Sequence, residues 1–162
     1  MRVEDWPAVA HVYAQAIEDG DATFEERVPD WRGWDDAHLP TPRLVARDAG
    51  AVVGWAALTP VSRRPVYRGV AEVSVYVARD ARGRGIGRAL LRELVPRSEA
   101  AGVWTLQASV FPENQASVAL HRSCGFRVVG RRERLAEHRG HWRDVLLLER
   151  RSSSVGCENH EP

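Results

Sequence analysis

The chain has 162 residues and a mass of 18.1 kDa, a size that suits one compact domain with a hydrophobic core. Its 23 basic residues nearly balance its 22 acidic ones, so the charge does not favour a nucleic acid or an anionic membrane as partner. All 23 basic residues are arginines, which excludes a Schiff-base lysine and the phosphate-binding lysine of a Walker A motif.

The sequence also disfavours a membrane-spanning segment, a metal site and a disulfide bond. No apolar run reaches the roughly 18 residues of a membrane span, and the first residues do not resemble a signal peptide. The two cysteines, Cys124 and Cys157, lack metal-binding spacing and are expected to be free thiols. We therefore expect a cytoplasmic protein without a metal.

Two helices are expected in the first 40 residues. Asp5 can cap the first helix and Gly20 can end it, with apolar residues at helical spacing between them. A shorter helix is expected to follow Asp30, with Trp31 and Trp34 on one side.

The central part of the chain reads as strands. A hairpin is expected from residues 43–48 and 51–59, followed by an arginine-rich loop at 60–69. The stretch 70–77 alternates as a strand does, and its side chains divide between two faces. One face holds Ala71, Val73, Val75 and Val77, and the other holds Val70, Glu72, Ser74 and Tyr76.

The second half alternates strands and helices. A glycine-rich turn at 82–87 leads into a helix that ends near Gly102. A strand is then expected at 103–110, a short helix at 114–123, a strand after Phe126 and a last strand at 141–149. This order predicts an α+β domain over residues 1–150, with a β–α–β crossover at 70–110 and a loose tail at 151–162.

The turn after residues 70–77 has the composition of an anion-binding loop. Glycines let successive N–H groups point into one concavity, and the following helix adds the positive end of its dipole. The glycines are Gly83, Gly85 and Gly87, and the nearby arginines are Arg82, Arg84 and Arg88. A dinucleotide fingerprint fails because Arg88 stands where its third glycine belongs, so we expect a different pyrophosphate ligand.

Two motifs carry a resemblance to a known family. The R-x-x-G-x-G spacing of Arg82, Gly85 and Gly87 resembles the coenzyme A loop of the GNAT superfamily of N-acetyltransferases. The run from Asn114 and Ser117 through His121 to the Gly125-Phe126 turn is similar to the family's second motif, and the resemblance covers roughly residues 2–149. His121, Ala71-Glu72 and residues 140–144 resemble the phosphinothricin/methionine-sulfoximine N-acetyltransferase subgroup in particular.

The resemblance implies a mixed, mostly antiparallel central sheet flanked by helices, and acetyl-CoA as co-substrate. The family's first strand is essentially missing before Arg2–Asp5, so either the true start lies upstream or the sheet edge is covered in another way. The edge of the 75–77 strand is expected to pair with the pantetheine arm. The implied coenzyme-binding residues are Val75, Tyr76, Val77, Arg82, Gly83, Arg84, Gly85, Ile86, Gly87, Arg88, Asn114 and Ser117.

The resemblance also suggests catalytic and acceptor residues. Glu72 is expected to take a proton from the acceptor amine, a backbone N–H near Tyr76 to meet the oxyanion, and His121 to protonate the leaving thiolate or share the base role. The implied acceptor-binding residues are Phe24, Trp31, Trp34, Arg63, Arg64 and Tyr67. Without the resemblance, Glu72 reads as a solvated strand residue, His121 and the tryptophans as core, and the arginine loop as solvated.

The leading hypothesis is an enzyme that acetylates the amine of a small amino acid or analogue. A non-catalytic module that binds acyl-CoA is the alternative from another class, and a peptide N-terminus or an antibiotic amine is the alternative acceptor. Two titratable groups beside the thioester favour the enzyme. A homodimer is implied by the family alone.

Overall fold

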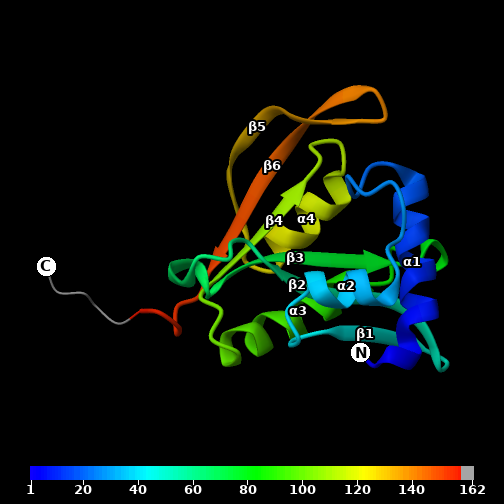
Figure 1. The fold of residues 1–162 in the computed structure, drawn as a ribbon, viewed down its shortest axis with the longest axis horizontal. Helices are drawn as coiled ribbons and strands as arrows, with labels where there is room; N and C mark the ends of the chain where they lie inside the picture. Colours follow the sequence, from blue (N-terminus) through cyan, green and yellow to red (C-terminus); the bar gives the residue numbers. More distant parts are fainter. Residues whose placement is uncertain (158–162) are drawn as a thin grey trace, which may run out of the picture.

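The computed structural model describes residues 1–157 and is built on a six-stranded sheet with the order β1-β2-β3-β4-β6-β5 (Figure 1). Only β3 and β4 run parallel; the other neighbours are antiparallel. The strands are β1 (Leu44–Asp48), β2 (Ala51–Pro60), β3 (Val70–Val77), β4 (Thr105–Val110), β5 (Arg127–His138) and β6 (His141–Arg151). The helices are α1 (Trp6–Asp19), α2 (Trp31–Ala37), α3 (Ile86–Ala100) and α4 (Gln115–Ser123).

Helices cover the sheet from both sides, and each side has its own apolar cluster. Leu90, Leu91 and Leu94 of α3 pack with β2, β3 and β4 in the larger cluster. On the opposite side, α1 and α2 bury Val12 and Trp34 against β2. The crossover from β3 through α3 to the parallel strand β4 confirms the expected β–α–β unit and the mixed, mostly antiparallel sheet.

The N-terminal helix α1 forms as expected, but Asp5, the residue before it, does not cap it through its side chain. Gly20 ends α1 in the left-handed conformation, with φ of 74°. The Asp5 side chain does not cap α1; its carboxylate accepts from the Arg2 N–H of the preceding turn and pairs with Arg47. The Arg2 hydrogen bond is the main reason that the pKa of Asp5 is lowered, with burial opposing it and Arg47 supporting it. This carboxylate therefore ties the chain start to the sheet.

Two strand boundaries differ by two residues from the sequence prediction, and the outer ends of the predicted hairpin differ by one. β4 begins at Thr105 rather than residue 103, because the Val103 N–H bonds back to Ser98 at the end of α3. β6 continues to Arg151, whose guanidinium donates to the carbonyls of Val155 and Gly156. The first part of the predicted tail thus packs against the domain, while residues 158–162 lie outside the described part of the chain.

One edge of the sheet is β1, where the sequence suggested a missing strand, and the other edge is β5. β1 pairs only with β2, and the ammonium group of Met1 donates to the Arg43 carbonyl just before β1. Within residues 1–157, no helix has the length and apolarity needed to cross a membrane.

Candidate active site

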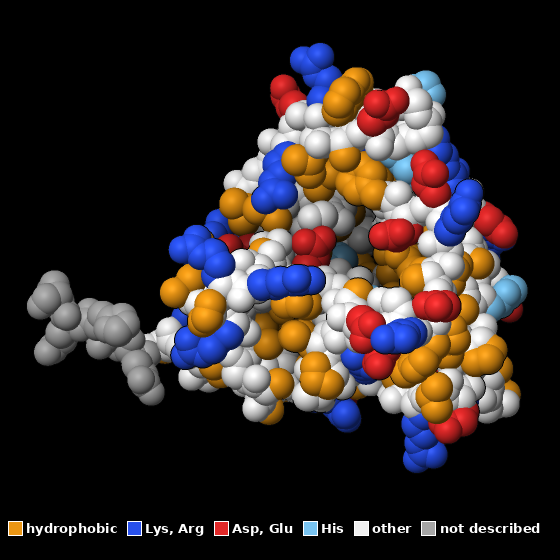
Figure 2. Space-filling model, viewed as in Figure 1, with side chains coloured by type: hydrophobic (Ala, Val, Ile, Leu, Met, Phe, Trp, Pro, Cys, Tyr) orange, Lys and Arg blue, Asp and Glu red, His pale blue; other side chains and the backbone are white. Residues whose placement is uncertain are grey.

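The two parallel strands at the centre of the sheet separate after a short paired stretch. β3 pairs with β4 only from Val70 to Glu72, whereas it pairs with β2 from Ala71 to Val77. The rest of β3 therefore has a partner on one side and a gap on the other. A cavity of about 890 Å³ opens beside this gap, and Figure 2 shows the face of the molecule hollowed, with acidic side chains at the rim.

The strand register indicates which backbone groups face the gap. The Ala78 N–H donates to Val53 of β2, and the register between the strands shifts nowhere along β3. Because hydrogen-bonding direction alternates along a strand, the N–H groups of Tyr76 and Ser74 also point to β2, and those of Val75 and Val77 point into the gap. The donor expected near Tyr76 is therefore its neighbour Val75 or Val77 and not Tyr76 itself.

The glycine-rich loop closes one end of the cavity. Gly83 and Gly85 have φ of 75° and 81°, which only glycine adopts without strain, and a Cβ at either position would meet no atom within 4 Å. Their backbone therefore faces open space at the N-terminus of α3. Gly87 serves close packing, since a Cβ there would lie 3.0 Å from Leu120 of α4.

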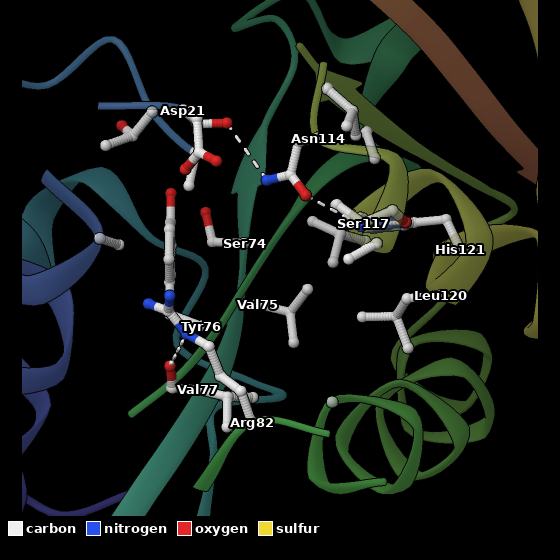
Figure 3. Close-up of a pocket in the computed structure, with 18 of the residues that line it drawn as sticks. Asp21, Ser74, Val75, Tyr76, Val77, Arg82, Asn114, Ser117, Leu120 and His121 are labelled. Atoms are coloured by element: carbon white, nitrogen blue, oxygen red, sulfur yellow. Dashed lines mark hydrogen bonds between the residues drawn. The ribbon is translucent and has the colours of Figure 1, made fainter. Parts of the chain in front are cut away.

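The arginines of this loop divide into two groups. Arg82 and Arg88 line the cavity, and the Arg82 Nε donates to the Val77 carbonyl at 3.2 Å (Figure 3). Asp19 at the end of α1 holds Arg82 with an Nη2–Oδ2 distance of 2.7 Å. Arg84, predicted as a coenzyme ligand, does not line the cavity and pairs with Asp48 of the β1–β2 turn at 2.7 Å.

The pKa of Asp19 reflects its contacts with Arg82 and Arg79. Burial by itself would raise the pKa of Asp19, but hydrogen bonds from Arg82 and Arg79 outweigh burial and lower that pKa. The carboxylate is therefore charged at neutral pH and pairs with both guanidiniums.

Helix α4 supplies the opposite wall of the cavity. The Asn114 Oδ1 caps the helix by accepting from the Ser117 N–H at 3.0 Å, and its Nδ2 donates to the Asp21 carbonyl at 3.2 Å (Figure 3). Asn114 thus joins α4 to the loop that follows α1. Ser117 lines the same cavity.

His121 lies one turn further along α4 and is 3% exposed. Its Nδ1 is 2.8 Å from the Ser117 carbonyl, which assigns the proton of the neutral ring to Nδ1. Nε2 is buried without a partner among the described residues, and burial lowers the pKa of His121, opposed by the Ser117 hydrogen bond. The neutral ring therefore offers a lone pair at Nε2, so it can accept a proton there but has none to donate.

Glu72 lines the cavity where β3 and β4 begin to separate. Its Oε2 accepts from the Nε2 of Gln107, opposite it on β4, at 3.1 Å. No residue of the described chain bonds its Oε1. The side chain is half-buried, and Ser74 and Tyr76 follow it on the same face of β3.

Aromatic side chains form the other end of the cavity. Phe24 meets Phe111 edge to face at 4.8 Å, and the rings of Tyr13 and Tyr76 lie 4.9 Å apart. Burial raises the pKa of both phenols, so they stay protonated near neutral pH. Glu25 lies in this part of the cavity as well. Arg82 and Arg88 also line the cavity, but they come from the glycine loop and from the first turn of α3.

Several predicted acceptor residues lie outside the cavity. Phe24 lines it, but Trp34 is 1% exposed and packs in the core with Trp55, and Trp31 packs on Trp34. Helix α2 therefore turns its indoles toward the core of the domain. Arg63, Arg64 and Tyr67 lie on the exposed loop before β3 and do not reach the cavity lining.

Sequence reasoning missed six residues of this region: Tyr13, Asp19, Asp21, Glu25, Gln107 and Phe111. Asp19 could have been suspected as a carboxylate at a helix end, but nothing in the sequence places it beside Arg82. Phe111 and Gln107 follow from the strand register, which the sequence does not give.

The chemistry of the cavity suits acetyl-CoA. A gap with unpaired N–H groups at Val75 and Val77 suits an amide-containing arm, and the open glycine loop at a helix N-terminus suits a pyrophosphate. No group of three or more metal-ligating side chains occurs in the part of the chain that the structure describes.

Comparison with known proteins supports the same picture. Residues 4–126 match the model of the acetyltransferase (GNAT) family. The chain is 39% identical to phosphinothricin N-acetyltransferase from Alcaligenes faecalis, over 93% of this chain and 79% of that enzyme. It is 34% identical to the L-methionine sulfoximine/L-methionine sulfone acetyltransferase of Pseudomonas aeruginosa, over 91% and 89%. A GNAT phosphinothricin acetyltransferase from Sinorhizobium meliloti, solved with AcCoA, superposes with a TM-score of 0.88 at 30% identity, covering 98% of this chain and 89% of its own.

Proposed function

Because the chain belongs to the acetyltransferase (GNAT) family, we propose that it transfers the acetyl group of acetyl-CoA to the amine of a small amino acid or amino-acid analogue. Phosphinothricin and methionine sulfoximine or sulfone are the acceptors we favour, since relatives at 39% and 34% identity carry those names. The observation that carries the proposal is Glu72, a carboxylate with one free oxygen at the point where β3 leaves β4.

Acetyl-CoA supplies an activated acetyl thioester, and the residues of this chain bind and orient it. We infer that the Gly83–Arg88 backbone holds the pyrophosphate and that the free edge of β3 aligns the pantetheine arm. The N–H of Val75 or Val77 then donates to the carbonyl oxygen as negative charge develops on it. Arg82 takes the Val77 carbonyl, which leaves the Val75 carbonyl, on the same edge, as the acceptor that we assign to the pantetheine arm.

Glu72 removes the proton that prevents an α-ammonium group from attacking. Its free Oε1 is the atom we assign to this step, acting directly or through one water. Three cavity carboxylates, those of Asp21, Glu25 and Glu72, favour the approach of a cationic amine. Arg63 and Arg64, on the exposed loop before β3, would bind the acceptor's acidic group through their guanidinium forks.

His121 is better suited to accept a proton than to donate one in the resting enzyme. The Ser117 carbonyl fixes its tautomer, and burial lowers its pKa, so Nε2 is a lone pair near neutral pH. We propose that Glu72 takes the proton of the ammonium group and that Nε2 takes the next proton from the nitrogen of the tetrahedral intermediate. The C–S bond then breaks, and Nε2 passes this proton to the departing thiolate. This assignment favours the alternative of the sequence hypothesis, in which His121 shares the base role.

A thiol-release assay tests the proposal. Acetyl-CoA is incubated with phosphinothricin, methionine sulfoximine, methionine sulfone, the common amino acids, an N-terminal peptide and an aminoglycoside. We expect release with the first group and a fall in kcat of about 10²- to 10⁴-fold in Glu72→Gln, with acetyl-CoA affinity retained. Binding of acetyl-CoA without turnover of any amine would favour the non-catalytic module instead. Turnover of the peptide alone would move the acceptor class to protein N-termini.

We further infer a cytoplasmic homodimer that works without a nucleic-acid or membrane partner. Cys124 and Cys157 are free thiols, as a reducing compartment favours. Trp142 and Leu135 of the β5–β6 hairpin are 62% and 45% exposed, an apolar surface that association would cover. Light scattering of the purified protein gives the mass, and a monomer would contradict the dimer.

A further inference from the structure

A row of polar side chains crosses the sheet through Glu72. Residues paired in register on neighbouring strands share a face, and the pairs Thr59–Glu72, Glu72–Gln107, Gln107–Glu149 and Glu149–Arg127 form one continuous line over five strands. Its outer end is closed by the Arg127–Glu149 ion pair at 2.7 Å. At its centre, Gln107 lies between two carboxylates and donates to only one of them, that of Glu72.

The hydrogen bond from Gln107 to Glu72 lies at the point where β3 and β4 separate. Glu72 and Gln107 are the last paired residues before β3 and β4 separate, so beyond them no ladder holds the two strands together. Neighbouring side chains on β3 do not constrain Glu72, since alternation turns Ala71 and Val73 to the opposite face. The Gln107 amide is therefore the contact that sets the carboxylate's orientation, holding Oε2 and leaving Oε1 toward the cavity.

We propose that Gln107 is a positioning residue for the acetyl transfer and holds the Glu72 carboxylate in the orientation that takes the amine proton. The proposal rests on the proposed function, in which Glu72 is the base. An amide is suited to this position because it donates a hydrogen bond to the charged carboxylate and has no charge of its own. The charged groups that share this surface are Glu149 and Arg127 in the row, and Asp21, Glu25, Arg82 and Arg88 in the cavity.

Two substitutions separate the hydrogen bond from the volume of the side chain. Gln107→Met keeps length and volume but cannot donate, and we expect kcat to fall by about 5- to 30-fold with KM for acetyl-CoA nearly unchanged. Gln107→Glu is isosteric and places a like charge beside Glu72. It should move the acid limb of the kcat/KM profile to higher pH by about one unit, because a carboxylate next to a second negative charge holds its proton more tightly.

The matched control is Thr105→Val, on the same strand and the same face, two residues away from Gln107. Thr105 pairs with Val70 and Arg151 rather than with Glu72, so its replacement should leave kcat and the pH profile unchanged. Glu149→Gln is the second control, because it breaks the Arg127 ion pair without touching Glu72.

A double-mutant cycle decides between positioning and a structural role. In a Glu72→Gln background, Gln107→Met should reduce kcat no further, since the group that it positions is already gone. Additive losses, accompanied by a lower Tm and a raised KM for acetyl-CoA, would overturn the positioning role. Wild-type kinetics in both Gln107 variants beside an inactive Glu72→Gln would overturn it while leaving the proposed function intact. Wild-type turnover in Glu72→Gln would instead remove the base, and the positioning role with it.

Discussion

The two ends of the cavity are built in different ways. At the glycine-loop end, the backbone of Gly83–Arg88 and the edge of β3 create the site, and side chains adjust it. At the aromatic end, side chains from α1, the loop after it, β3 and β4 meet, and no local stretch of sequence describes the result. The comparison teaches that a backbone-built site can be read from one motif, whereas a site built from side chains depends on how distant segments pack.

The largest expected effect comes from breaking the backbone-built end. Gly85→Asp places a negative charge at the N-terminus of α3 and forces φ of 81° on a residue with a Cβ. We expect acetyl-CoA affinity, measured by calorimetry, to fall by about 100-fold or more. Gly102→Asp is the matched control, because Gly102 has φ of 84° and equally open surroundings at the other end of α3. Equal loss of affinity in both variants would show that strain and not the charge is responsible.

Arg64→Ala tests whether the arginine loop before β3 adds a side-chain contact to the acceptor. If the guanidinium binds the acceptor's acidic group, KM for the amino acid should rise by about 3- to 10-fold, with KM for acetyl-CoA unchanged. Arg63→Ala, on the neighbouring residue, is made alongside it. If steady-state kinetics show no change, or an equal change for both substrates, the loop is only a solvated surface.

Asn114 makes two hydrogen bonds, one that caps α4 and one to the loop after α1, and two variants separate them. Asn114→Ala removes the cap of α4 and should lower stability by about 1 kcal/mol, seen as a lower Tm. Asn114→Asp keeps the cap but cannot donate to the Asp21 carbonyl, so Tm should hold while KM for the acceptor rises about threefold. An unchanged acceptor KM in Asn114→Asp would mean that the loop holds its position without this hydrogen bond.

The smallest expected effect concerns pH. Burial lowers the pKa of His121 in the folded protein, so below about pH 6.5 the unfolded chain binds the proton more readily. Stability is therefore full above that pH and falls as the pH drops toward the lowered folded value. His121→Gln should flatten this slope in urea titrations. His38, whose pKa burial also lowers, should contribute a second, independent part of the slope through His38→Gln.

The sequence was sufficient for much of this fold. The alternation of residues 70–77 and the apolar spacing before Gly20 predict β3 and α1 correctly, because burial of one face leaves a regular period. The glycine motif likewise predicts the open loop before the N-terminus of α3. The sequence could not separate Arg82 from Arg84, since both follow the same strand and only packing turns one to Asp19 and the other to Asp48. Trp31 and Trp34 misled for the same reason, as an indole suits a core as well as a pocket.

The one-sided pairing of β3 gives adjacent amides of a single strand different access to water. The Tyr76 N–H is bonded within the ladder to β2, while the Val75 and Val77 N–H groups face the gap. Backbone deuteration is slow where a ladder must open and fast where no partner exists. Exchange from Ser74 to Val77 should therefore alternate from residue to residue in the free protein, and the fast members alone should slow when acetyl-CoA is added. The exchange rates of the Val75 and Val77 amides would therefore report directly whether acetyl-CoA is bound.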